Sequence, residues 1–197
     1  MSTSGVVQQR SDPHLHHRLH PRREQRPAEL LVFNLDKKKG SDNVVIQKGN
    51  VTHYVLKRQL FGKKYSLTSG ESNNTLIRAV THKAVGYITL KSDVFLIHFN
   101  LSFPKFPRGV YTFEIDGIQY LWDYEMNSHL RCFTVQDTKL VAQIFSSAIV
   151  TSSLSQCFSN ATQWNAKLAM VKDVAVSSGA LSLIIMTGLL LIKKQIW

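Results

Sequence analysis

Apolar and polar residues alternate along most of the chain between residues 30 and 171. Tyr111, Phe113 and Ile115, for example, place apolar side chains on one face of an extended segment, with polar residues between them. Such alternation is typical of a strand with one buried face. About twelve short runs of this kind, rich in Val, Ile, Tyr, Phe and Thr, are separated by Gly, Asn, Asp, Ser or Pro, as strands are by turns. We therefore expect a mainly β protein, either a barrel or a sandwich.

Some connections between these runs are specific enough to predict. Asp116-Gly117 separates two alternating runs, and this dipeptide supplies the positive φ angles of a tight hairpin. The runs at 84–90 and 94–99 predict two successive strands. The uncharged, Ser- and Thr-rich stretch 146–164 predicts a long surface loop, and a further strand near 148–151 remains an open alternative.

The last apolar segment, residues 174–192, contains no charged residue and is followed by Lys193 and Lys194. As a helix it would be roughly 28 Å long, close to the roughly 30 Å hydrocarbon thickness of a bilayer. A helix that is apolar on all sides is also found buried inside a protein. We favour a buried core helix, with Asp173 as its N-terminal cap, and a tail anchor in a membrane is the alternative.

The net charge of +11 is concentrated in one part of the chain. Residues 31–110 carry thirteen Lys or Arg against four Asp or Glu, a net charge of +9, whereas residues 111–197 are balanced at six against six. Residues 1–29 are rich in His, Arg and Pro and poor in large apolar residues, which predicts a disordered basic tail. The first half of the predicted barrel is therefore the part that would attract an anionic partner.

Sequence patterns of known catalytic and metal sites are missing. The chain has no GxSxG, glycine-rich phosphate loop, HExxH or CxxC, so we expect a non-enzymatic protein without a metal or another cofactor. Tyr120, Trp122 and Tyr124 share one face of a strand, which suggests either core packing or a platform for stacking bases. Two cysteines and the absence of a long apolar run in residues 1–9 favour an intracellular, cytoplasmic protein, with membrane association left open.

Three stretches in the C-terminal half resemble a fungal protein family of unassigned function with a tubby C-terminal-like domain. They are YTFEIDGIQYLWDY, LRCFTVQDTKLVAQI and the closing strand with its apolar helix, AKLAMV to LLLIKK. The resemblance extends over residues 44–194. It implies a closed antiparallel barrel of about twelve strands around a C-terminal helix, similar to tubby, LURP-one-related proteins and phospholipid scramblases. The barrel domain would then comprise residues 30–197.

Tubby, which is similar in fold, binds phosphoinositide headgroups through Lys and Arg on its barrel surface. No motif here matches those positions, so the candidates come from the charge distribution alone. We expect an anionic lipid headgroup or membrane surface to contact the basic residues of the early strands and turns, Lys37, Lys38, Lys39, Lys57, Arg58, Lys63 and Lys64. A protein partner and, less favoured, a nucleic acid are the other partners left open, and the same lysines could simply be solvated.

Overall fold

The computed structural model describes residues 29–38, 40–59, 63–82, 84, 86–102, 111–125, 129–146, 164–172, 174 and 176–194. Within these residues the structure forms twelve strands and one helix. The strands are β1 (Leu30–Lys37), β2 (Val44–Lys48), β3 (Val51–Gln59), β4 (Lys64–Ser69), β5 (Thr75–His82), β6 (Tyr87–Ser92), β7 (Ile97–Ser102), β8 (Tyr111–Ile115), β9 (Ile118–Glu125), β10 (His129–Thr134), β11 (Leu140–Ser146) and β12 (Trp164–Val171), and the helix is α1 (Ser178–Lys194).

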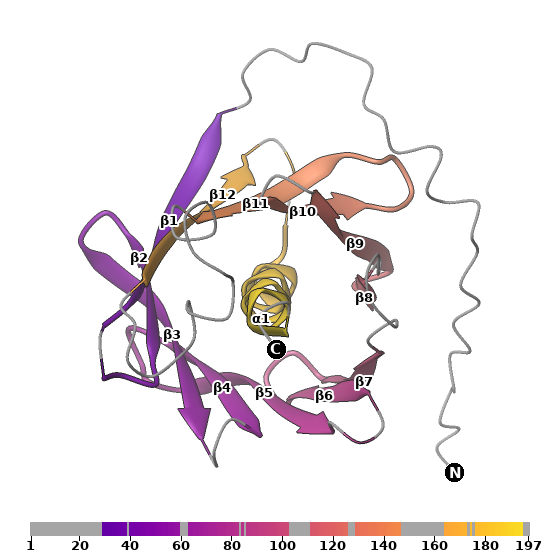
Figure 1. Ribbon diagram of the computed structural model, residues 1–197. Helices are drawn as coiled ribbons and strands as arrows, with labels where there is room; N and C mark the ends of the chain where they lie inside the picture. The colour runs from indigo at the N-terminus through magenta and orange to yellow at the C-terminus, as the bar shows by residue number, and fades with distance from the viewer. Residues whose placement is uncertain are drawn as a thin grey trace.

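All twelve strands belong to one antiparallel sheet that curls into a nearly closed barrel (Figure 1). The order is β7-β6-β5-β4-β3-β2-β1-β12-β11-β10-β9-β8, so the first and last strands of the chain pair with each other. β7 and β8 are the two edge strands of this order, and they face each other where the barrel is not closed. The described residues of these two strands form no β-ladder with each other. The predicted mainly β barrel of about twelve strands is confirmed.

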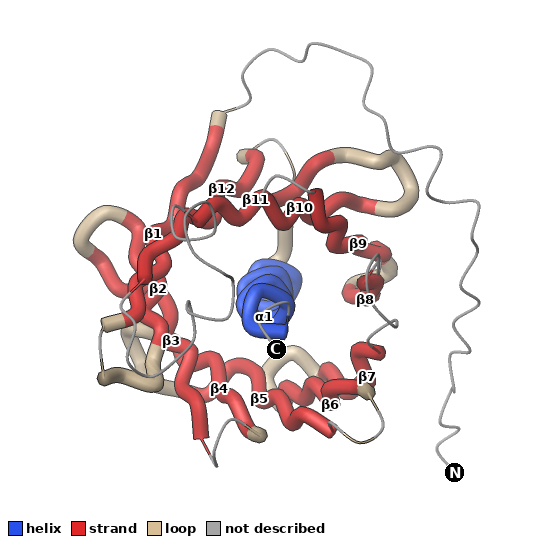
Figure 2. Tube along the Cα trace, viewed as in Figure 1, coloured by secondary structure: helices blue, strands red, loops and turns tan. Residues whose placement is uncertain are grey.

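Helix α1 runs through the centre of the ring (Figures 1 and 2). Its residues from Gly179 to Ile192 are buried except for the half-buried Leu181. The inward residues of the strands, such as Phe33, Leu35 and Ile46, complete the same core. The helix thus buries its apolar surface against the barrel wall on every side, which is the buried alternative expected for this segment. Within the described residues, no helix has the length and apolarity needed to cross a bilayer.

The helix begins at Ser178, four residues later than the expected start at 174. Ser177 is the cap, because its Oγ accepts a hydrogen bond from the Ala180 N–H at 3.1 Å. The same hydroxyl donates to Asp116 Oδ2 at 2.6 Å. The carboxylate of Asp116, from the β8–β9 hairpin, thus lies at the helix start. The predicted cap, Asp173, lies outside the described residues.

Two contacts fix how far the helix is inserted and how it is rotated. The Trp122 indole N–H donates to Thr187 Oγ1 at 2.8 Å, and both side chains are fully buried. One residue further along, Gly188 leaves no space for a side chain, since a Cβ there would lie 2.8 Å from Trp122 Cζ2 and 2.7 Å from Ile144 Cδ1. Because the helix backbone touches β9 and β11 at this point, only glycine fits without a shift in the neighbours.

The β8–β9 hairpin has the predicted tight turn, with φ of 55° at Asp116 and 72° at Gly117. β6 and β7, in contrast, lie about three residues further along the chain than the runs at 84–90 and 94–99 predicted. The discrepancy arises because residues 93–96 form the turn between these strands. Val94, Phe95 and Leu96 in this turn are apolar, and the sequence pattern therefore predicted a strand here.

The segments on either side of the barrel differ from the sequence prediction in smaller ways. Glu29 belongs to the barrel edge, because its backbone oxygen accepts from the Lys172 N–H at 2.9 Å and its carboxylate pairs with the Lys172 ammonium. The rest of the predicted tail, residues 1–28, lies outside the described residues, as does most of the predicted loop, residues 147–163.

Candidate anion-binding surface

The six basic candidates among the described residues lie on β1, β3, β4 and the adjoining turns, and two of them, Lys37 and Arg58, lie beside the last turns of the helix. They divide into two groups. Lys37 and Arg58 are on the inward face of their strands, whereas Lys57 and Lys64 are on the outward face. Lys38 and Lys63 are exposed beside the strand ends, and Lys39 lies outside the described residues.

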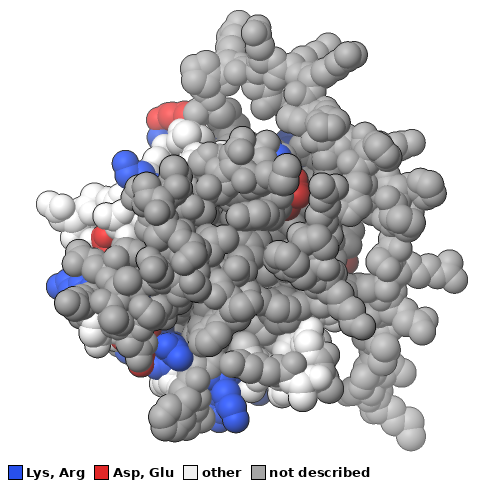
Figure 3. Space-filling view, in the orientation of Figure 1, with Lys and Arg blue, Asp and Glu red and all other residues white. Residues whose placement is uncertain are grey.

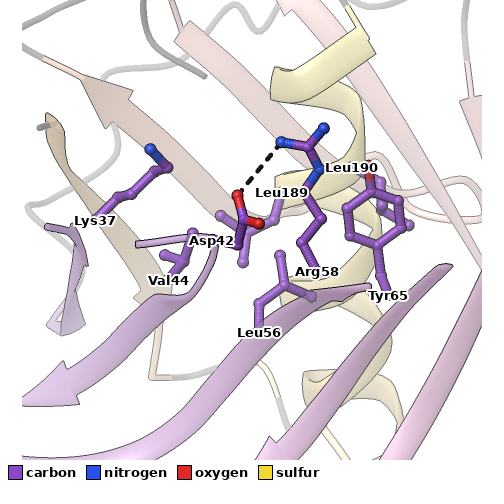
Figure 4. Close-up of a pocket in the computed structure, with 8 residues that line it drawn as sticks. All are labelled: Lys37, Asp42, Val44, Leu56, Arg58, Tyr65, Leu189 and Leu190. Carbon is purple, nitrogen blue, oxygen red and sulfur yellow. Dashed lines mark hydrogen bonds and ion pairs between the residues drawn. The ribbon is translucent and has the colours of Figure 1, made fainter. Parts of the chain in front are cut away.

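The inward pair lines a small pocket beside the last turns of α1 (Figure 4). Lys37 is only 4% exposed, and this burial lowers its pKa; nearby Asp42 raises the pKa, and Arg58 lowers it further. Arg58 Nη1 lies 3.5 Å from Asp42 Oδ1. The cavity, about 20 Å³, holds little more than a water molecule. These charges close the barrel end and complement the C-terminal end of the helix dipole, and an organic ligand does not fit among them.

The outward candidates belong to a longer row of basic residues across the outside of the barrel. Lys57 on β3 is opposite Ser66 on β4, and Ser66 is opposite Arg78 on β5. Arg78 is opposite Lys91 on β6, which is opposite His98 on β7. Lys64 lies on the same outward face of β4, two residues from Ser66. We call the outward side chains of Lys57, Lys64, Arg78 and Lys91 the basic wall.

Arg78 and Lys91 were not among the sequence candidates. Their alternation with buried residues did signal that both face outward, since Arg78 lies between Ile77 and Ala79 and Lys91 follows Leu90. Their alignment across the β5–β6 hairpin depends on the register of that pair, which the sequence prediction had displaced. The sequence alone therefore does not predict the basic wall, because its residues are brought together by the pairing of the strands.

One acidic residue, Asp93, forms ion pairs with two members of the basic wall. Asp93 lies 3.2 Å from Lys91 Nζ through Oδ1 and 3.7 Å from Arg78 Nη1 through Oδ2. All three side chains are more than half exposed, so these ion pairs stabilise the fold little. Two like charges directly opposite on neighbouring strands are unfavourable, and a single carboxylate leaves this group with an excess of one positive charge.

The basic residues are spread unevenly round the barrel. In the view of Figure 3, the visible Lys and Arg atoms lie mostly over β1 to β5, along the left and lower rim. On the far side of the sheet, Arg131 is paired with Asp123 at 3.6 Å and Lys139 with Asp137 at 2.8 Å. The positive charge of the first half of the chain is thus gathered on one side of the folded domain.

The aromatic residues considered as a platform for stacking bases are mostly buried in the core. Tyr120 and Trp122 are buried, with the Tyr120 ring stacked on Phe113 at a centroid distance of 5.2 Å, so neither offers a face to a base. The side chain of Tyr124 lies outside the described residues. Among the side chains that the structure describes, no three His, Cys, Asp or Glu residues come together as metal ligands would.

Comparison with known proteins adds no relative. No protein-family model, no curated protein sequence and no solved structure matches the chain.

Proposed function

We propose that this chain is a non-enzymatic, tubby-like barrel protein that binds an anionic phospholipid surface through its basic wall. The proposed relationship is supported by the fold, since a twelve-stranded antiparallel barrel around a C-terminal helix is what the resemblance implies. Binding is supported by one observation above all: Lys57, Arg78 and Lys91 lie in one row across four strands, on the outside of the barrel.

The basic wall suits a surface better than a small ligand. Its side chains extend from a convex barrel exterior, and the pocket near Lys37 and Arg58 is too small for a headgroup. Each Lys or Arg near an anionic membrane contributes about 1 kcal/mol, and salt screens this attraction. Several such residues on one side of the domain would give weak, reversible, salt-sensitive attachment. With Tyr120 and Trp122 in the core, stacking of a nucleic-acid strand has less support.

The test is cosedimentation of the full chain with vesicles of phosphatidylcholine alone and of phosphatidylcholine with phosphatidylserine. We expect binding only to the anionic vesicles, weakening as salt is raised to about 0.15 M. A variant that combines Lys57→Gln, Arg78→Gln and Lys91→Gln should bind at least tenfold less tightly, because it loses about three favourable charges.

The control removes the same charge from the other side of the barrel, with Lys139→Gln, Lys167→Gln and Lys172→Gln, all exposed residues. This control should retain most of the binding. Equal losses in the two variants would show that net charge alone attracts the protein, and the basic wall would have no special role. Absence of binding to anionic vesicles at low salt would refute the proposal, and binding to a random oligonucleotide instead would favour a nucleic-acid partner.

A further inference from the structure

The β6–β7 turn, residues 93–96, presents two large apolar side chains to solvent. Leu96 is 91% exposed and Val94 is 59% exposed. Leu96 also has a φ of 53°, in the left-handed region that non-glycine residues other than Asn and Asp seldom adopt. Scattered apolar residues on a surface are ordinary, but two in one turn, one of them strained, are not.

The conformation of this turn is fixed by the interior of the barrel. The Phe95 N–H donates to Ser92 Oγ at 3.0 Å, and Ser92 is only 4% exposed. The Phe95 ring lies against the first turn of α1, where a Cβ on Gly179 would be 3.3 Å from it. Because Phe95 packs inward over the helix start, Val94 and Leu96 are held outward, so their exposure is a built feature of the turn.

The exposed turn is continuous with the basic wall. Asp93, the first residue of the turn, pairs with both Arg78 and Lys91. Leu96 lies two residues before His98, which is opposite Lys91 and faces outward. Its side chain is 91% exposed, so it lies on the molecular surface close to the basic row. The exposed apolar side chains of the turn and the positive charges of the basic wall can thus contact the same flat surface.

Two side chains are too few for a stable protein interface, which buries about 800 Å² on each partner. Apolar residues beside Lys and Arg are, in contrast, the composition of segments that enter the headgroup region of anionic membranes. We propose that the β6–β7 turn is an interfacial anchor, which inserts Val94 and Leu96 into an anionic bilayer while the basic wall contacts the headgroups. This inference rests on the proposed function and specifies how the barrel is oriented on the membrane.

Leu96→Trp is the direct probe. On vesicles of phosphatidylcholine with phosphatidylserine, the added Trp fluorescence, measured as the difference from the unsubstituted protein, should shift to the blue and be quenched by brominated lipid. On phosphatidylcholine alone it should not change. If the protein sediments with anionic vesicles while this signal stays that of an exposed Trp, the anchor is wrong and the proposed function stands.

Leu96→Gly tests the anchor without endangering the fold. It removes the apolar side chain and relieves the positive φ, so the thermal midpoint should stay or rise, while affinity for the anionic vesicles should fall about tenfold. Val51→Ser is the control, since Val51 is 55% exposed on another hairpin, and it should change affinity less than twofold. Equal affinity of Leu96→Gly and the unsubstituted protein would overturn the anchor. Failure of every form to bind anionic vesicles would overturn the proposed function itself.

Discussion

Thr187 is the residue at which helix and wall are joined by a buried polar contact. Its hydroxyl accepts from the Trp122 indole and donates to the Leu183 carbonyl oxygen at 2.6 Å. Thr187→Val keeps the shape but leaves the buried indole N–H without an acceptor. We expect the free energy of unfolding to fall by about 1–3 kcal/mol, measured by urea denaturation.

Thr187→Ser is the matched control, because it retains the hydroxyl and loses only a methyl group. It should be clearly more stable than Thr187→Val. If the two variants were equally destabilised, the methyl packing and not the hydrogen bond would be the important contribution of this side chain.

Single residues also show what sequence alone could determine. The Asp116-Gly117 turn followed from its own chemistry, since the required φ angles depend on those two residues. The position of Lys37 was not predicted, because we expected this residue on the surface. Strand β1 continues to Lys37, which therefore faces inward like Phe33 and Leu35. Its neighbours in the pocket, Asp42, Arg58 and the end of the helix, come from other segments of the chain.

At the scale of elements, the fit of α1 against the wall depends on Gly188. In an exposed helix, Gly→Ala stabilises by about 1 kcal/mol through propensity. Here the added methyl would overlap Trp122 and Ile144, and overpacking of this kind costs about 1–3 kcal/mol. We therefore expect Gly188→Ala to lower stability in thermal or urea unfolding, the reverse of the usual effect.

Combining Gly188→Ala with Ile144→Val is an informative comparison. Removal of the Ile144 Cδ1 methyl, the atom nearest the added Cβ, should recover part of the loss, so the two effects would not be additive. Strict additivity would contradict the contact as the cause.

Element boundaries show where local patterns mislead. Apolarity predicted a strand through Val94, Phe95 and Leu96, yet these residues turn. The outcome was decided by Phe95 packing on the helix start, a contact between segments more than 80 residues apart in the chain. Because the predicted strands were displaced, the alignment of Arg78 with Lys91 was not predicted, and these two of the three basic residues in the row were missed. The helix start at Ser178 was likewise set by a distant partner, Asp116.

At the scale of the whole molecule, the barrel could be anticipated because few folds can bury both the apolar faces of twelve strands and one uncharged apolar helix. Alternation alone left a sandwich open, and the resemblance supplied the closed form. β1 pairs with β12, so the first and last described strands lie side by side. Among the described residues, α1 is the one helix, and its side chains fill the ring together with the inward side chains of the strands. A barrel without this helix would expose the inward face of every strand.

Deleting residues 173–197 tests this dependence directly. Inward side chains such as Leu67, Ile77 and Leu90, all at 0% exposure, would line an empty interior, and empty apolar volume is destabilising in proportion to its size. We expect the shortened chain to lose cooperative thermal unfolding and to bind a hydrophobic dye such as ANS. Deletion of residues 1–28 is the control of similar length, since it keeps Glu29 and every described strand, and it should unfold cooperatively near the midpoint of the full chain. A chain ending at Lys172 that still melted cooperatively would show that the strands can close without α1, and the helix would then be free for a role outside the barrel.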